Sequence, residues 1–222
     1  LALGFDRAGI IPLGPPVHGA AFTDWLAVGY GGEMAYLAAR ATERLDPSAW
    51  LRDAASLIVA AASYFSGPPP APWADLAHGR FARYAWAADY HDLLKARLYA
   101  LDAFIRSRTG RATFGKACVD TAPLLERDFA AQADLGFIGR NTCLITPGLG
   151  SWTFLAALAV PERLDEGRRT NDEGRRTKDE RRRTKDEGRR TKDKGREANV
   201  LSCFVVRRSA AVGCGRCTRC LE

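Results

Sequence analysis

The alternation of apolar and polar positions predicts a layered domain of strands and helices within residues 1–164. The apolar run at 56–64 has the length and composition of a strand buried on both faces. Between 89 and 108, apolar residues recur with helical spacing, which predicts an amphipathic helix. The pattern also predicts helices at 24–28, 33–42 and 123–135, a helix start at Asp46-Pro47, and strands at 112–120, 141–146 and 152–160. Because strands and helices alternate along the chain, the fold class is α/β or α+β.

No stretch of the chain has the apolar length of a membrane-spanning helix. The longest apolar run, 57–65, is about half of the roughly 20 residues that a bilayer requires. The first residues show no basic segment followed by an apolar core, so we expect no signal peptide. These observations favour a cytoplasmic protein that does not bind membranes and whose six cysteines stay reduced.

The net charge of +7 is concentrated in one segment. Residues 165–197 contain no apolar residue and repeat a seven-residue unit, which begins as Glu-Gly-Arg-Arg-Thr at 166–170. Residues 166–197 hold 14 Lys/Arg and 9 Asp/Glu, a net of +5, so the rest of the chain has a net charge of only +2. We interpret 165–197 as a disordered charged insert, because it has no apolar side chains to bury. A basic arm that contacts RNA is the alternative.

Three cysteines near the C-terminus form the sequence Cys214-x-x-Cys217-x-x-Cys220. Thiolates at this spacing begin the pattern that holds iron–sulfur clusters in bacterial ferredoxins. The fourth cysteine of that pattern would fall at position 224, so we expect the chain to be truncated within a cluster-binding module that starts at 198. A zinc site and a coincidence of spacing are the alternatives. The other cysteines are interpreted as ordinary buried or half-buried residues: Cys118, Cys143 and Cys203.

Asp120 stands where one predicted strand ends and a predicted helix begins. In an α/β sheet, ligands bind beyond the carboxyl ends of the strands. A partly desolvated carboxyl group at such a place can donate a proton to a ligand. The alternative is that Asp120 or Thr121 caps the helix that follows.

Two glycine-containing turns and one aromatic–histidine segment are weaker candidates for binding. Glycines at 136, 139, 148 and 150 let a ligand approach the backbone closely, although any tight turn uses glycine. The segments 83–86 and 89–92 hold Tyr84, Tyr90 and His91. A single histidine is more often structural than functional, so its role stays open.

Taken together, these segments resemble the epoxyqueuosine reductase family. The most specific of them reads Val-Asp-Thr-Ala-Pro-Leu-Leu-Glu-Arg at 119–127. All of them follow the order of the family, and they lie at 4–6, 31–37, 83–85, 89–91, 119–127, 135–142, 150–152 and 214–220. They extend over about 1–160 and 213–222.

The resemblance implies an α+β fold in three parts. Residues 1–164 would form a nitroreductase-like, layered corrinoid-binding domain that carries the catalytic residues. Residues 165–197 would be the disordered repeat insert. Residues 198–222 would be the start of a ferredoxin-like module, incomplete in this chain.

The resemblance also implies cofactors and residue roles. Cobalamin would reduce epoxyqueuosine to queuosine in tRNA, the last step of queuosine biosynthesis, with electrons from [4Fe–4S] clusters. Asp120 would be the proton donor. The cofactor contacts would be Tyr84, Tyr90, His91, Arg127, Gly139, Arg140, Asn141, Thr142 and Ser151. The cluster ligands would be Cys214, Cys217 and Cys220.

The implied partners are the anticodon region of a tRNA and a low-potential electron donor, and the implied state is a monomer. Two other interpretations stay open. One is an inactive remnant of such an enzyme. The other is a related corrinoid iron–sulfur reductase of the dehalogenase type.

Overall fold

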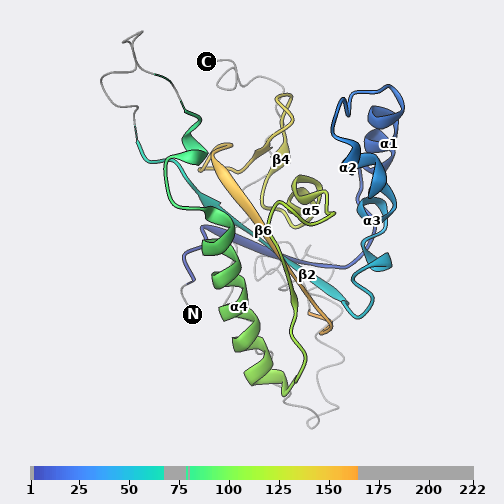
Figure 1. Ribbon diagram of the computed structural model, residues 1–222. Helices are drawn as coiled ribbons and strands as arrows, with labels where there is room; N and C mark the ends of the chain where they lie inside the picture. The colour runs from blue at the N-terminus through green and yellow to red at the C-terminus, as the bar shows by residue number, and fades with distance from the viewer. Residues whose placement is uncertain (1–2, 68–78, 80, 165–222) are drawn as a thin grey trace, which may run out of the picture.

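A four-stranded sheet forms the centre of the computed structural model, which describes residues 3–67, 79 and 81–164 (Figure 1). Its strands are β1 (Arg7–Pro12), β2 (Ser56–Ser63), β6 (Thr153–Val160) and β3 (Lys116–Cys118), in that spatial order. All neighbouring strands are antiparallel. The architecture is therefore α+β, and the α/β alternative with parallel strands is wrong. The predicted insert at 165–197 and the segment 198–222, with four of the six cysteines, lie outside the described residues.

The central strands β2 and β6 pair along their whole length, from Ser56 opposite Val160 to Ser63 opposite Thr153. Successive side chains of β2 point to opposite faces of the sheet. Leu57 and Val59 enter one hydrophobic core, and Ile58 enters the other. This explains why the strand has no polar alternation, and it confirms the prediction of a strand buried on both faces.

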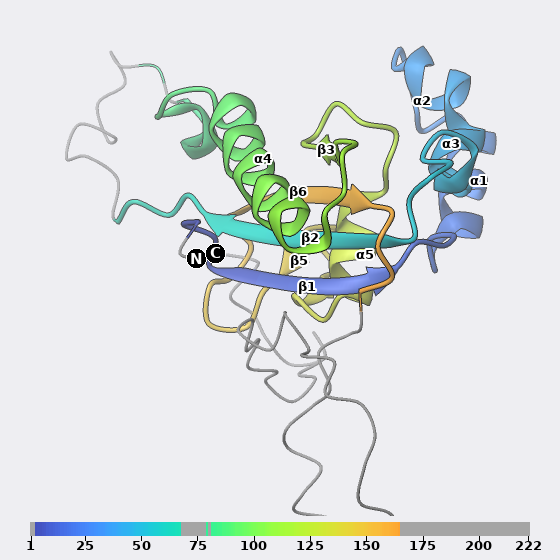
Figure 2. The ribbon, with the colours of Figure 1, turned by 90° about the horizontal axis from the view of Figure 1, so that it is seen from below.

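One helix covers each face of the sheet (Figure 2). Helix α4 (Tyr90–Thr109) packs on one face, and α5 (Glu126–Gln132) packs on the other. The predicted amphipathic helix at 89–108 is confirmed by α4. The Asp89 side chain caps it by accepting a hydrogen bond from the His91 amide at 2.8 Å. Gly110 ends it with a φ of +72°, a conformation that glycine adopts without strain.

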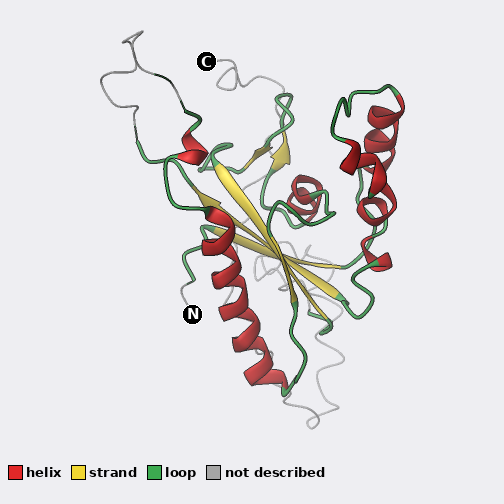
Figure 3. Ribbon diagram, in the orientation of Figure 1, coloured by secondary structure: helices red, strands yellow, loops and turns green. Residues whose placement is uncertain are grey.

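Three short helices and one single helical turn gather at one end of the sheet (Figure 3). They are α1 (Gly19–Ala27), α2 (Ala35–Ala39), α3 (Ala41–Leu45) and the single turn η1 (Pro47–Ala49). The predicted helix at 33–42 is instead two helices, because the backbone of Arg40 leaves the helical region with a φ of −117°. The helix predicted at 24–28 starts five residues earlier, at Gly19. The predicted start at Asp46-Pro47 is confirmed, and Asp46 caps the turn.

Three predicted elements are shorter than expected. The strand predicted at 112–120 is reduced to β3, and the helix predicted at 123–135 is reduced to α5. The strand predicted at 141–146 is reduced to β5 (Leu144–Ile145), which pairs with β4 (Phe137–Ile138) in a small hairpin. The strand predicted at 152–160 is confirmed by β6. In the part of the chain that the structure describes, no helix combines the length and the apolar character needed to cross a bilayer.

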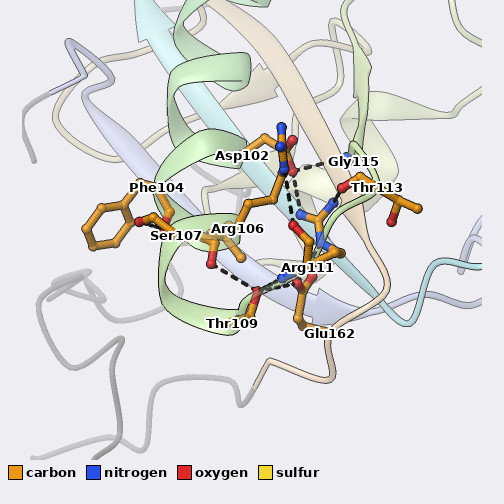
Figure 4. Close-up of polar contacts among 10 residues, drawn as sticks. Asp102, Phe104, Arg106, Ser107, Thr109, Arg111, Thr113, Gly115 and Glu162 are labelled. Atoms are coloured by element: carbon orange, nitrogen blue, oxygen red, sulfur yellow. Dashed lines mark hydrogen bonds and ion pairs between the residues drawn. The ribbon is translucent and has the colours of Figure 1, made fainter.

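A buried ion-pair cluster joins the end of α4 to the end of β6 (Figure 4). Arg111 Nη2 lies 2.5 Å from Asp102 Oδ1, and Arg111 Nε lies 2.6 Å from Glu162 Oε1. Asp102 is fully buried and also accepts a hydrogen bond from the Gly115 amide at 3.1 Å. Thr109 donates to Glu162 Oε1 at 3.0 Å. This Arg111 cluster fixes the C-terminal ends of both elements, because each charge needs its partner once it is out of water.

Candidate functional site

Asp120 lies two residues beyond the end of β3, on a sharp turn of the chain. Its φ is +56°, a left-handed conformation that aspartate tolerates better than most residues. The amide of Thr121 donates to the Val119 carbonyl at 2.6 Å, which closes the turn and ends the strand. Helix α5 begins only at Glu126, with Leu125 at its N-cap. The alternative that Asp120 or Thr121 caps this helix is therefore wrong.

The carboxyl group of Asp120 is held by the first two residues of α4. The Tyr90 hydroxyl donates a hydrogen bond to Asp120 Oδ2 at 2.9 Å. His91 Nε2 lies 3.4 Å from the same oxygen. His91 Nδ1 lies 2.7 Å from Asp89 Oδ1, so the N-cap carboxylate orients the imidazole. The fold thus brings the adjacent residues Tyr90 and His91 into contact with Asp120, which lies 30 positions after Tyr90 in the sequence.

The electrostatics of this site favour a tyrosine that keeps its proton. Burial raises the pKa of Tyr90, and the hydrogen bond to Asp120 and the negative charge of that residue raise it further. The phenol therefore remains a hydrogen-bond donor at physiological pH. The Asp120 side chain itself is 63% exposed, so a ligand can reach it. An exposed carboxyl group fixed at one oxygen is suited to exchange a proton with a bound ligand.

Glu126 is a second carboxyl group at this site that the sequence analysis missed. Burial raises its pKa to about 8, and the charge of Asp120 also raises it, against the opposing effects of Arg44 and Arg127. Its Oε1 atom is buried and has no hydrogen-bond partner among the described residues. Glu126 was part of the quoted segment 119–127, but nothing in its spacing indicated that the carboxyl group would be buried.

The turn of the β4–β5 hairpin holds four of the predicted cofactor contacts. Arg127 donates hydrogen bonds to the carbonyl and the hydroxyl of Thr142, the latter at 3.3 Å. Asn141 Oδ1 accepts from the Cys143 amide at 3.1 Å. A Cβ atom on Gly139 would lie 2.5 Å from Ile145 Cδ1 and 2.7 Å from Asn141 Oδ1, so a larger residue there would require both side chains to move. These residues shape the turn, and Arg140 is exposed on it.

Tyr84 and Ser151 lie in other segments. Tyr84 is exposed on η3 (Arg83–Ala85), and Ser151 precedes β6. Among the residues that the structure describes, no hydrogen bond or ion pair joins Tyr84, Arg140 or Ser151 to Asp120. The geometry therefore gathers Tyr90 and His91 around Asp120, and it places the other predicted contacts on η3, on α5, on the hairpin turn and before β6.

The described cysteines differ from each other in environment. Cys118 is buried as expected, and burial raises the pKa of its thiol to about 12. Cys143 is exposed, which corrects the expectation that it is buried, because it lies on the hairpin turn. Within residues 3–67, 79 and 81–164, no group of three or more His, Cys, Asp or Glu side chains is arranged to hold a metal ion. The predicted cluster ligands and Cys203 lie outside the described residues.

Parts of this chain are similar to known proteins. A family model described as epoxyqueuosine reductase QueG, DUF1730, matches residues 44–121. The epoxyqueuosine reductase of Vibrio cholerae is 34% identical over 172 residues, which cover 75% of this chain and 46% of that protein. The epoxyqueuosine reductase of Pseudomonas aeruginosa is 36% identical over 160 residues, which cover 71% of this chain and 44% of that protein.

The fold is similar to that of solved structures as well. A crystal structure of epoxyqueuosine reductase with an epoxyqueuosine-modified tRNA stem loop superposes with a TM-score of 0.59 at 26% identity. The match covers 74% of this chain and 44% of that chain. The chain thus spans about half the length of the relatives that it matches. The resemblance found in the sequence is confirmed.

Proposed function

Since this chain is a relative of the epoxyqueuosine reductases, we propose that it serves the reduction of epoxyqueuosine to queuosine in tRNA. The observation that carries the proposal is the exposed carboxyl group of Asp120, held by Tyr90 and His91 inside the matched region. The tRNA stem loop bound by a structural relative supports a tRNA substrate.

Asp120 is the proton donor in this proposal. Removing the epoxide oxygen to leave a carbon–carbon double bond takes two electrons and two protons, and the oxygen departs as water. Such an oxygen leaves readily only when it is protonated, which requires an acid held close to it. Tyr90 and His91 fix the carboxyl group by one oxygen. Its exposure leaves it accessible to the substrate.

We propose cobalamin as the cofactor, and two observations support it. His91 Nε2 is a buried atom that makes no hydrogen bond in the described part of the chain and lies 3.4 Å from Asp120 Oδ2, and Arg140, Asn141 and Thr142 on the hairpin turn are exposed. When bound, the corrinoid supplies the electrons for the reduction. The residues that would hold it are Tyr84, Tyr90, His91, Arg127, Gly139, Arg140, Asn141, Thr142 and Ser151.

The remaining parts of the proposal follow the family resemblance. Cys214, Cys217 and Cys220 would hold an iron–sulfur cluster, for which three closely spaced thiolates are suitable ligands. Residues 1–164 would be a nitroreductase-like domain, 165–197 the insert, and 198–222 the start of a ferredoxin-like module. The protein would act as a monomer in the cytoplasm, with electrons from a low-potential donor.

The test compares the chain with its Asp120→Asn variant, which keeps the size of the side chain but cannot donate a carboxyl proton. Both proteins are loaded anaerobically with cobalamin and given tRNA containing epoxyqueuosine. A chemical reductant strong enough to reduce the cobalt directly is added, so that electron delivery by clusters is not required. We expect the variant to form queuosine about 100-fold more slowly or worse, with unchanged cobalamin affinity.

The product is measured by mass spectrometry of the tRNA nucleosides, and cobalamin binding is measured by its absorbance. Equal rates for the two proteins would exclude Asp120 as the proton donor. No queuosine from the cobalamin-loaded chain would contradict the proposed function itself.

A further inference from the structure

Three exposed aromatic rings surround one buried arginine close to the Asp120 site. The guanidinium carbon of Arg83 lies 5.0 Å from the ring centre of Phe65, 4.6 Å from that of Trp86 and 5.1 Å from that of Trp152. Arg83 is only 9% exposed, and it donates hydrogen bonds to Ser66 Oγ at 3.3 Å and to the Gly67 carbonyl at 2.5 Å. The arginine therefore fixes the three rings from beneath.

All three rings are partly exposed to solvent. Phe65 is 56% exposed, Trp152 is 42% exposed and Trp86 is 38% exposed. A folded domain usually covers large rings, and a cluster that stays exposed marks a binding surface. The rings are also rigidly held. Trp152 packs edge-on against Tyr64, and Trp86 Nε1 donates to the Phe81 carbonyl at 3.1 Å. We call Phe65, Trp86 and Trp152 the aromatic surface.

A continuous series of ring contacts connects the aromatic surface to Asp120. Tyr64, which touches Trp152, lies 4.5 Å from Phe154 between ring centres. Phe154 stacks on Tyr90 at 4.1 Å, with the two ring planes only 7° apart. Tyr90 holds the Asp120 carboxyl group. The contributing segments are the end of β2, the start of β6, η3 and the start of α4, which meet at the same end of the sheet (Figure 3).

The charge beneath the rings favours an anionic partner. Arg83 has no carboxylate partner among the described residues, and its contacts there are rings and neutral oxygens. Within this part of the chain its positive charge is therefore not cancelled. Flat, exposed rings together with a cation are the combination that proteins use to stack the unpaired bases of single-stranded nucleic acids. A purely apolar protein partner would gain nothing from the arginine.

Resting on the proposed role in tRNA modification, we propose that the aromatic surface stacks unpaired bases of an RNA loop while another nucleotide of that loop reaches Asp120. Stacking requires no particular base, because every base has a flat face. The surface thus supplies affinity for the looped-out conformation of the RNA rather than for one sequence.

The test measures binding of the 222-residue chain to an unmodified anticodon stem-loop RNA and to a duplex made by closing the same stem without a loop. Trp152→Ala should weaken binding of the stem loop by about 5-fold to 100-fold, and Trp152→Phe should retain most of the affinity. Phe65→Ala tests the same surface on a loop beyond β2, where a folding defect is easier to avoid. The salt dependence of binding should not change, because no phosphate contact is removed.

The matched control is Phe114→Ala. Phe114 is also an exposed ring, 73% accessible, with the guanidinium carbon of Arg106 4.0 Å from its ring centre. Phe114 precedes β3 and lies next to the C-terminal half of α4. Asp120 contacts the first residues of the same helix, so the control residue lies at the other end of α4 from the proposed site. Its loss should leave stem-loop affinity unchanged, and circular dichroism should show that every variant keeps the fold.

Three outcomes would overturn the proposal. One is wild-type stem-loop affinity in both Trp152→Ala and Phe65→Ala. Another is an equal loss of affinity for the stem loop and the duplex. The third is a loss of cobalamin affinity without a loss of RNA affinity, which would assign the rings to the corrinoid. If the wild-type chain forms queuosine while Trp152→Ala and Phe65→Ala keep their RNA affinity, only the proposal about the aromatic surface is refuted. If the variants lose RNA affinity but the wild-type chain forms no queuosine, only the proposed enzymatic function is refuted.

Discussion

Replacing Glu126 by glutamine should change how the stability of the protein depends on pH. Glu126 lies at the start of α5, and burial together with the nearby charge of Asp120 raises its pKa from 4.5 to about 8. In the folded protein this carboxyl group therefore holds a proton at neutral pH. In the unfolded chain it is solvated and loses the proton near pH 4.5. Glutamine has nearly the same shape and cannot ionise.

The magnitude follows from the two pKa values. Between pH 4.5 and 8 the folded state binds one more proton than the unfolded state, so the free energy of unfolding falls as pH rises. Raising a carboxyl pKa from 4.5 to about 8 corresponds to about 5 kcal/mol over that range. This is a large part of the roughly 5–15 kcal/mol that holds a typical domain folded. The Glu126→Gln substitution removes the ionisable group, and with it this fall in the free energy of unfolding as pH rises.

The assay is urea denaturation of the wild-type protein and Glu126→Gln at several values between about pH 4 and 9, the range that brackets the two pKa values. Near the acidic end the two should be nearly equal in stability, and at the alkaline end the variant should be more stable by several kcal/mol. Glu33→Gln, at an exposed position, is the control and should follow the wild type. If the curves for the wild type and Glu126→Gln run parallel across the whole range, the carboxyl group is not protonated in the folded state and the reasoning fails.

Three other substitutions or reactions have definite expected outcomes. Arg111→Met leaves the buried Asp102 carboxylate unpaired and should lower the free energy of unfolding by about 3–5 kcal/mol; pairing it with Asp102→Leu in a double variant should recover most of that loss. Iodoacetamide at about pH 8 should modify exposed Cys143 but not buried Cys118, whose thiol pKa is about 12; peptide mass mapping checks this, and modification of Cys118 at a similar rate would contradict it. Tyr90→Phe removes the hydrogen bond to the proposed proton donor and should slow queuosine formation about 10-fold or more at saturating cobalamin; an unchanged rate would show that the bond is dispensable.

The long elements were predictable because their sequence patterns reflect burial directly. The run that forms β2 is apolar at every position that faces either core, and the spacing in α4 follows its contact with one face of the sheet. Asp89 caps α4 and Gly110 ends it by mechanisms that depend on neighbouring residues alone. Asp120, Tyr90 and His91 were also singled out as site residues, through the family resemblance rather than through spacing, and the structure places them in contact.

The short elements were not predictable, because contacts distant in sequence decide their ends. Before β3 the chain turns toward Asp102 on α4. The Gly115 amide donates a hydrogen bond to the Asp102 carboxylate there, so the strand does not extend to this residue. The contact between Tyr90 and Asp120 depends on α4 packing beside the antiparallel pair β3 and β6. The burial of Glu126 depends on tertiary packing in the same way. None of these contacts leaves a local pattern in the sequence.

The way the chain leaves the sheet after β6 bears on how this domain can vary during evolution. Glu162 is tied to Arg111, and the Leu164 amide donates to Ser56 Oγ at 2.9 Å, so two residues beyond the strand are fixed from different elements. Length added beyond Leu164 therefore does not alter the register of β6 against β2. The entropic cost of a longer connection grows only slowly with its length. Chain length added after position 164 should therefore cost the folded domain little stability, so folding alone places only a weak limit on a repeat that expands there.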